Sequence, residues 1–508
     1  MRQYFLFFGV ILYVKHVVCV RVKKFVTMKL TTYMRGLFLS LLCCLLCSPA
    51  VAQKKDADKQ LPRGYNLTLT VKGGDDTVMY MGYYYVGKTY AVDTARVDKK
   101  GRFVFASKTM VLRPGMYFFT NPSGNYVEFI VYNEAPNFVF ETESRSWNDC
   151  MKVKGSKENE LFYDYHRANK RLYNVLDSAR QVKTDEEAFK AFYKKCQHEL
   201  DSLKLGIIEN NPERFLSLMM NATRDPKVPT TDSTGRTLSQ RERYEYYMNH
   251  YFDYMALDND AMVRTPDAVF HKRVMDYLDK NLKNAGPEVI IEYVDKMIDR
   301  SIPSKEVFKY LVHTITERYL QSNIMSYDAI YVHLVKKYFA TELNYWSAPS
   351  VIDEQMKRAN TWERLLIGKT APDLMLHDAD GTWHTLSGLR HKYTLLVFWS
   401  PTCGHCKTVI PELYRKYSQY KEQCDIGSFC ILSEPDEETY PKWHRFIKDN
   451  GLDWLNLDGG EANIDWHEVY DVITTPQIYL LDKDKKILAK KLNADSFEMV
   501  IKALEHLE

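Results

Sequence analysis

The hydrophobic pattern changes its period twice along this chain, and that change constrains the fold more than any other feature. Over residues 61–145, apolar and polar residues alternate in short runs separated by turn residues. Over residues 155–364 apolar residues recur at helical spacing, and over residues 366–508 strand-like and helical segments alternate. The pattern predicts a multi-domain chain with an antiparallel β-sandwich, an all-α middle region and an α/β carboxy-terminal domain. A length of 508 residues suits about three domains.

Residues 1–52 form an upstream and signal segment by their composition. Lys29 and Arg35 give a basic start after Met28, an apolar run without charges follows, and the segment ends in a small-x-small pattern at residues 50–52. This order predicts a cleaved secretory signal. The apolar run is shorter than the roughly twenty residues that span a bilayer, which argues against a membrane anchor. A lipid anchor on Cys47 is the less favoured alternative. We therefore expect an exported protein of the periplasm or cell envelope.

The net charge of +3 comes from that leading segment. Removing its seven basic residues leaves 62 Lys and Arg against 66 Asp and Glu, which is a net charge of −4. No basic field remains to attract nucleic acid, so nucleic-acid partners are not expected.

Two further patterns lie outside the α/β region. Thr184 with Glu187, and Ser239 with Glu242, have the spacing of capping boxes at helix starts. In the predicted sandwich, a tyrosine cluster occupies residues 80–85. We favour half-buried strand positions for these tyrosines, with a platform for carbohydrate or peptide as the alternative. The helical region contains no metal-ligand spacing or phosphate loop, so neither a metal nor a cofactor is expected.

The chemistry of the chain is concentrated at Cys403-Gly-His-Cys406, which follows a buried strand and opens a helix. Residues three apart on a helix lie close enough for a disulfide, and a thiol at the helix start is stabilised as a thiolate. A haem site would need His in place of Lys407. A zinc site would need two more ligands, and Cys424 and Cys430 are favoured as buried small residues. The motif therefore predicts a redox-active dithiol that needs no cofactor.

The segment 398–411 resembles the active site of the thioredoxin superfamily, including a proline five residues after the second cysteine. Thr475-Pro476 resembles the cis-proline loop of that family. The lead-in at residues 368–372 resembles the exported branch that contains TlpA- and ResA-like proteins. The sandwich and helical regions resemble, more weakly, the amino-terminal parts of multi-domain thioredoxin-like proteins of Bacteroidetes. The resemblance implies a carboxy-terminal thioredoxin fold over residues 366–508.

The resemblance also implies roles for single residues. Cys403 would attack a substrate disulfide and Cys406 would resolve the mixed disulfide. Trp399, Thr475 and Pro476 would bind the substrate chain. The implied partners are thiols and disulfides of exported proteins, with a membrane redox partner that recycles the site.

Two positions depart from thioredoxin. Val397 occupies the place of its buried aspartate, so either another acid such as Glu412 or water accepts the proton of Cys406, or deprotonation of Cys406 is slow. His405 replaces a proline and gives the dipeptide of protein disulfide isomerases, which implies a reduction potential nearer about −180 mV than about −270 mV.

Three functions follow from these patterns. The favoured one is a thiol–disulfide oxidoreductase, either a reductase or isomerase-like. A thiol peroxidase is disfavoured because Leu396 stands where that motif needs proline. The remaining alternative is an envelope binding or assembly protein in which the thioredoxin domain is subsidiary.

Overall fold

The structure is a computed structural model that describes residues 63–181 and 186–507. The predicted signal segment and Thr184 of the first capping box lie outside the described residues. The described residues form one compact unit. Within the described part of the chain, no helix combines the length and apolar character that a membrane crossing requires.

The first eight strands build a sandwich of two four-stranded sheets, in the orders β4-β1-β7-β8 and β3-β2-β5-β6. Alternate side chains of β1, including Leu67 and Leu69, face the core between the sheets, as the period of two predicts. The expected antiparallel pairing holds except between β1 and β7, which are parallel. The chain crosses to the second sheet and returns at β7, so no hairpin fixes that direction. The strands are β1 Tyr65–Lys72, β2 Val78–Tyr85, β3 Lys88–Arg96, β4 Arg102–Ser107, β5 Gly115–Thr120, β6 Tyr126–Val131, β7 Val139–Glu143 and β8 Lys152–Lys154.

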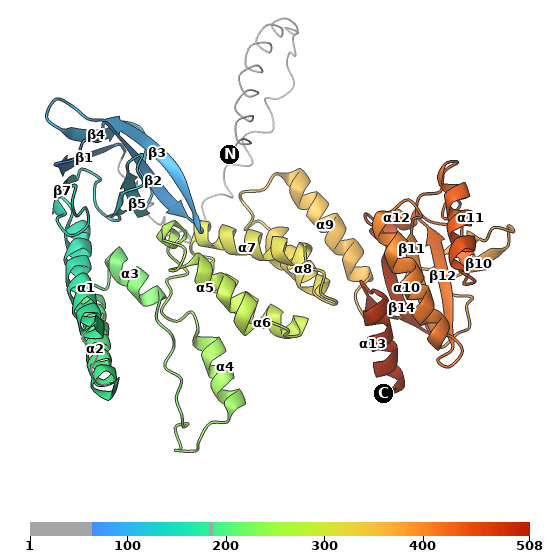
Figure 1. Ribbon diagram of the computed structural model, residues 1–508. Helices are drawn as coiled ribbons and strands as arrows, with labels where there is room; N and C mark the ends of the chain where they lie inside the picture. The colour runs from blue at the N-terminus through green and yellow to red at the C-terminus, as the bar shows by residue number, and fades with distance from the viewer. Residues whose placement is uncertain (1–62, 182–185, 508) are drawn as a thin grey trace, which may run out of the picture. The chain divides into compact units, whose positions relative to one another are not determined.

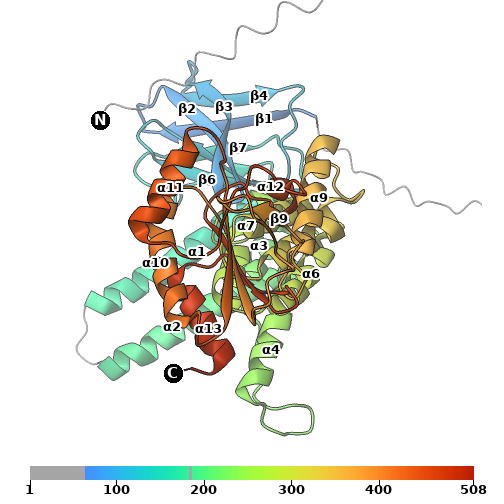
Figure 2. The same ribbon diagram turned by 90° about the vertical axis from the view of Figure 1, so that its right-hand side faces the viewer.

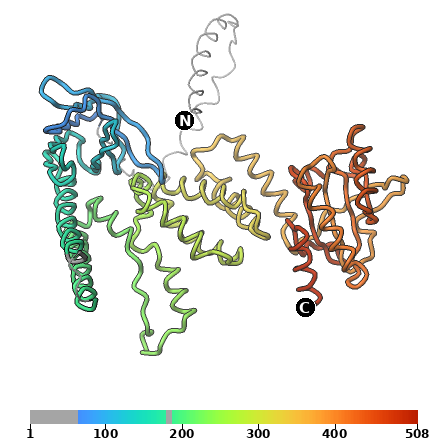
Figure 3. Tube along the Cα trace, in the orientation of Figure 1, coloured from blue at the N-terminus to red at the C-terminus, as the bar shows by residue number. Residues whose placement is uncertain are grey.

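The middle region is helical, as predicted. The capping box of Ser239 and Glu242 is present and begins α4, after the loop that joins α3 to α4 (Figure 3). Two of its helices continue directly into π-helical turns. The elements are α1 Lys157–Gln181, α2 Glu186–Asn210, α3 Phe215–Ala222, α4 Gln240–His250, η1 Asp260–Arg264, α5 His271–Asp276, η2 Tyr277–Asn281, α6 Pro287–Ser301, α7 Lys305–Leu320, α8 Asp328–Leu334, η3 Val335–Phe339 and α9 Pro349–Arg364.

The carboxy-terminal region has a five-stranded sheet in the order β13-β12-β11-β14-β15. Strand β11 is parallel to β12 and antiparallel to β14, and every residue of β11 and β12 is buried. This is the thioredoxin-like α/β fold that the sequence predicts. Its elements are β9 Met375–His377, β10 Trp383–Thr385, β11 Tyr393–Trp399, α10 Gly404–Tyr420, β12 Ile426–Leu432, α11 Thr439–Asn450, β13 Asn456–Leu457, α12 Trp466–Val469, β14 Gln477–Asp482, β15 Ile487–Lys490 and α13 Ala494–Glu505.

Helices cover both faces of this sheet (Figures 1 and 2). Helices α10, α11 and α13 lie on one face, over a core that includes Val397, Leu413, Trp443 and Ile501. The hairpin of β9 and β10 and the short α12 lie on the other face. Helices α10 and α11 share a face because each joins a strand to its parallel neighbour in the same direction across the sheet. The start of α10 is thereby placed at the carboxyl end of β11.

Candidate active site

Cys403 is the N-cap residue of α10, and Cys406 lies one turn into the helix. The backbone of Cys403 is extended, with φ −69° and ψ 121°, so the chain turns from the end of β11 into the helix at this residue. The Cys403 side chain is partly exposed, whereas Cys406 is fully buried. Both thiols are free. The strand–motif–helix context that the sequence predicts is therefore present, and its two thiols differ in access.

The loop before β14 brings Thr475 to Cys403. Strand β14 is antiparallel to β11, with Gln477 opposite Phe398, so the start of β14 meets the end of β11. The Cys403 thiol donates a hydrogen bond to the carbonyl oxygen of Thr475 over 3.3 Å. The Thr475–Pro476 peptide bond is cis, as the family resemblance implies. Thr475, Pro476 and the dithiol are thus one site, although 69 residues separate Cys406 from Thr475 in the sequence.

The pKa values of the two thiols differ because their surroundings differ. Partial burial opposes ionisation of Cys403, but hydrogen bonds from the Thr475 side chain and the backbone N–H groups of Cys406 and His405 outweigh it, so the pKa of Cys403 lies below its ordinary value. Burial raises the pKa of Cys406 to about 11. Cys403 is therefore the more acidic thiol of the pair, and Cys406 is protonated at neutral pH.

His405 and Trp399 occupy different surroundings. His405 is exposed on the first turn of α10, beside Cys403 in sequence and open to solvent. Trp399 has no exposed surface, and its ring packs 5.3 Å from the ring of Phe446 in the core. The Trp399 ring has no face with which to touch a substrate chain, because α10 and α11 cover it. The expectation that Trp399 binds substrate therefore has no support in this arrangement.

The structure places a carboxylate beside the dithiol that sequence reasoning missed. Glu434 follows β12 and accepts hydrogen bonds of 2.7 Å from the hydroxyls of Ser400 and Thr402. Those hydrogen bonds lower the pKa of Glu434, so the carboxylate is ionised at neutral pH. Because β11 and β12 are parallel, their carboxyl ends lie at the same edge of the sheet. Polar residues just after these two strands are the sequence pattern from which the position of Glu434 could have been predicted.

The structure also places Val397, which replaces the buried acid of thioredoxin, and Glu412, the candidate proton acceptor. Val397 is fully buried in the core under α10, as expected for the place of thioredoxin's aspartate. Glu412 lies on α10 with an exposed side chain. An exposed carboxylate on the helix surface is poorly placed to accept a proton from the fully buried Cys406.

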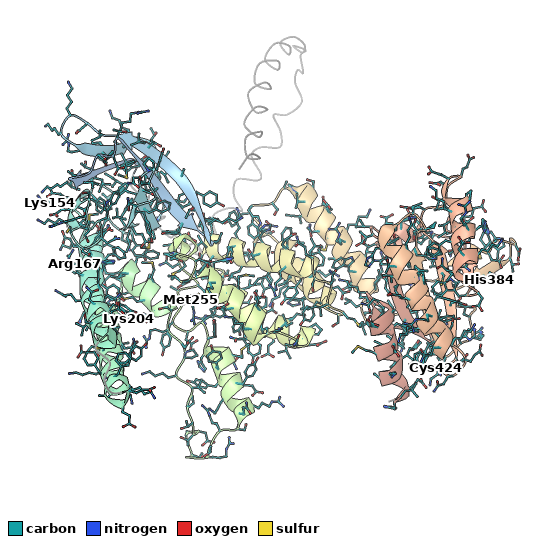
Figure 4. The ribbon with its side chains drawn as sticks, viewed as in Figure 1. Lys154, Arg167, Lys204, Met255, His384 and Cys424 are labelled. Atoms are coloured by element: carbon teal, nitrogen blue, oxygen red, sulfur yellow. The ribbon has the colours of Figure 1, made fainter. Side chains whose placement is uncertain are left out.

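The other described cysteines are separate from this site. Cys424 and Cys430 are buried in the core beneath α10, which agrees with their interpretation as small core residues. Cys424 follows the carboxyl end of α10 (Figure 4), and Cys430 lies within β12. Cys196 is buried on α2. Among the residues that the structure describes, no three His, Cys, Asp or Glu side chains are grouped to hold a metal ion.

A thioredoxin-like domain with an acidic, accessible thiol and a buried partner thiol defines the class of thiol–disulfide oxidoreductases. Residues 367–490 match the model of the AhpC/TSA family. The chain is 30% identical over 139 residues to the thiol-disulfide oxidoreductase ResA of Bacillus cereus, a match covering 27% of this chain and 76% of the relative. It is 27% identical over 143 residues to ResA of Geobacillus kaustophilus, covering 27% of this chain and 78% of that relative.

This chain belongs to the ResA family of thiol-disulfide oxidoreductases, and it carries additional amino-terminal domains. Residues 65–162 match the domain of unknown function DUF4369, and residues 175–360 match the domain of unknown function DUF5106. Among solved structures, a thioredoxin-like protein from Bacteroides caccae aligns with 55% of this chain and 98% of its own, at 22% identity and TM-score 0.45. A domain of a possible thiol-disulfide isomerase from Cytophaga hutchinsonii aligns with 28% of this chain and 94% of its own, at 32% identity and TM-score 0.26.

Proposed function

We propose that this protein reduces or rearranges disulfides of exported proteins through its Cys-Gly-His-Cys dithiol. The observation that carries the proposal is the contrast between the two thiols. Cys403 is accessible and has a lowered pKa, while Cys406 is buried and has a pKa of about 11. A site built this way attacks with one sulfur and keeps the second protonated until the first is occupied.

The reaction follows from that order of ionisation. The Cys403 thiolate attacks one sulfur of a client disulfide, forming a mixed disulfide and releasing the other client sulfur as a thiolate. Cys406 then loses its proton and attacks Cys403, which breaks the mixed disulfide and releases the second client thiol. The client has gained two electrons, and Cys403 and Cys406 have become a disulfide. A dithiol partner in the membrane would return the two electrons and make the protein a reductase.

Isomerase-like behaviour uses the same first step. If a different thiolate of the client attacks the client sulfur of the mixed disulfide before Cys406 does, a new client disulfide forms and Cys403 leaves as a thiolate. The sulfur released in the first step stays reduced, so the client changes its pairing without net oxidation or reduction. The raised pKa of Cys406 favours this route, because a protonated resolving thiol attacks slowly. The signal pattern in residues 28–52 supports export to the periplasm or envelope, where protein disulfides persist.

Two serine variants test the assignment of roles. Cys403→Ser is expected to abolish insulin reduction, and Cys406→Ser to accumulate mixed disulfides that reducing agent releases. Cys424→Ala is the matched control, since this cysteine lies in the same domain at the far end of α10. Full turnover by the Cys403→Ser protein would sink the proposed chemistry. Mass spectrometry of the proteins trapped by Cys406→Ser in the cell envelope would identify the clients.

A further inference from the structure

A cleft of about 410 Å³ lies beside the tyrosine-rich strand β2, outside the thioredoxin domain. Its volume is within the range of small-ligand and side-chain pockets. Strands β2, β3 and β5, the segment before β5, η1 and the start of α7 all contribute to it. The lining residues are Tyr83, Tyr85, Ala91, Val92, Met110, Val111, Leu112, Arg113, Tyr117, Arg264 and Glu306.

Aromatic rings form one wall of the cleft. The Tyr83 ring stacks on Tyr90 at 5.6 Å and lies 5.9 Å from Tyr117, and Tyr85 meets Tyr90 edge-on at 6.2 Å. Tyr90, at the rim, is 43% exposed. Such a group of rings offers a large, rigid contact area at low cost in side-chain entropy. The tyrosines that the sequence places at residues 80–85 therefore do not all pack into the sandwich core.

A second group of lining residues is apolar and partly open to solvent. Met110 and Val111 lie between β4 and β5 and are 46% and 36% exposed, while Leu112 beside them is buried. Exposed aliphatic side chains and tyrosine rings in one cleft favour an occupant with apolar or aromatic side chains.

Among the residues that line the cleft, the charged side chains are two arginines and one glutamate. The carboxylate of Asp260, outside the lining, accepts a hydrogen bond from the backbone N–H of Glu306. The Arg264 side chain is buried, lies 5.5 Å from the Tyr85 ring and pairs with Glu306 over 3.3 Å. Arg113 pairs with the same Glu306 while its side chain stays largely exposed. Two guanidinium groups thus share one carboxylate, and a further carboxylate from a ligand would complete the pairing.

Backbone geometry holds Arg264 in this place. Gly115 has φ +150°, and a Cβ atom there would lie 2.3 Å from the Cβ of Arg264. Only glycine allows β5 and η1 to approach this closely, so the buried guanidinium belongs to a preformed site.

We propose that this cleft binds an extended segment of a client protein in which an acidic side chain neighbours an apolar or aromatic one. Among the described lining residues there is no Asn, Gln, Ser or Thr, so the neutral hydrogen-bonding side chains are limited to the tyrosine hydroxyls. The combination of tyrosine rings, aliphatic side chains and surplus arginine instead matches an acidic, apolar peptide. The inference rests on the proposed function, because it takes the occupant to be a protein client. A client held here would meet the dithiol of the same chain at a raised effective concentration.

Cysteine-free peptides test the cleft without disulfide chemistry. The probes are three fluorescein-labelled twelve-residue peptides in which Leu and Tyr alternate with Glu, with Gln or with Lys, and anisotropy of the full chain measures binding. We expect the Glu peptide to bind at least tenfold more tightly than the Gln peptide, and the Lys peptide most weakly. The preference should shrink at high salt, because paired charges are screened.

Matched variants locate the binding. Val111→Asp should weaken the Glu peptide at least tenfold, whereas Val104→Asp should change its affinity less than twofold. Val104 lies on β4 outside the cleft and is 41% exposed, close to the exposure of Val111. A second variant, Arg113→Gln, should abolish the preference for the Glu over the Gln peptide, since it removes the exposed guanidinium.

The outcomes separate this inference from the proposed function. Equal effects of Val111→Asp and Val104→Asp, no preference for the Glu peptide, or binding of a soluble oligosaccharide in place of peptide would overturn the cleft's assignment. A chain that reduces insulin but binds no peptide sinks only this inference. A chain that binds the Glu peptide but reduces no disulfide sinks only the proposed chemistry.

Discussion

The Cys403 thiol donates a hydrogen bond to the backbone carbonyl of Thr475 over 3.3 Å, while the Thr475 side chain lowers the pKa of both active-site thiols. One residue thus contacts the nucleophile through its backbone and stabilises thiolates through its hydroxyl. Under the proposed function, a client disulfide would reach Cys403 beside this loop. Thr475 is therefore placed to influence both the ionisation of the dithiol and the geometry of attack.

Replacing Thr475 with Val should slow alkylation of Cys403 at neutral pH. The variant loses the hydroxyl that helps hold the Cys403 pKa below its ordinary value, so less thiolate is present at pH 7. We expect the rate with iodoacetamide to fall about threefold to tenfold at pH 7 and to converge with the wild type near pH 9.5. The exposed neighbour gives a control, Thr474→Val, whose pH–rate profile should match the wild type. An unchanged midpoint in the Thr475→Val protein would contradict the role of the hydroxyl.

Glu434→Gln should loosen the segment that leads into the dithiol. Glu434 has a lowered pKa because Ser400 and Thr402 donate to its carboxylate, so its ionised form stabilises the folded state. That contribution is present above the unfolded pKa of about 4.3 and is lost as the pH falls through the lower folded value. Since the side chain is exposed, we expect a loss of about 1 kcal/mol or less at pH 7.

Urea unfolding at several pH values measures that effect. The difference between wild type and Glu434→Gln should be present at pH 7 and vanish near pH 3. Glu437→Gln replaces an exposed glutamate of the same loop and should change the unfolding midpoint little. A difference that persists at pH 3 would show that the carboxylate charge is not its cause.

A buried ion pair joins the thioredoxin domain to the helical region. Lys490 on β15 pairs with Asp328 at the start of α8, and both side chains are at most 7% exposed. Burial lowers the pKa of Lys490, and the charge of Asp328 opposes that shift. Lys490→Met would leave the Asp328 charge unpaired, so we expect the free energy of unfolding to fall by about 3–5 kcal/mol.

The double variant Lys490→Met with Asp328→Leu should recover most of that loss, because an apolar pair of similar size needs no compensating charge. Lys72→Met breaks an exposed ion pair with Glu141 and serves as the control, with little change in the urea midpoint expected. A double variant as unstable as the single one would mean that packing at this contact, and not the unpaired charge, sets the stability.

The local parts of the fold were predictable because each has a strong pattern of its own. The alternation of β1 and the buried run of β11 agree with the structure. The cysteine motif opens α10, as its place after a buried strand predicts, and forms the first turn of that helix. That turn carries no apolar stripe that periodicity could detect.

The rest depended on contacts between distant residues. The parallel pairing of β1 with β7 and the approach of Glu434 to Ser400 arise from chain crossings that local periodicity does not encode. Trp399 is buried because it lies under α11, whereas the motif alone predicted that it would bind substrate at the surface. The two cysteines and the Thr475-Pro476 loop could be predicted as one site because the resemblance to the thioredoxin superfamily covers both segments, although they are far apart in the sequence.

The last prediction concerns His405 and the reduction potential. His405→Pro removes the backbone N–H that donates toward Cys403 and lowers its pKa, and it also removes the imidazole. Loss of the N–H raises the Cys403 pKa, which destabilises the reduced form and lowers the potential; an imidazole that favours the thiolate would act in the same direction. His405→Gln removes the imidazole and keeps the N–H, so it separates the two causes. We expect the potential in glutathione titrations to fall by at least about 30 mV for His405→Pro, a tenfold change in equilibrium constant, and by less for His405→Gln. Equal shifts would assign the effect to the imidazole alone. If neither variant moved the potential, the position between the cysteines would have no part in setting it, and the comparison with isomerase-like proteins would lose its physical basis.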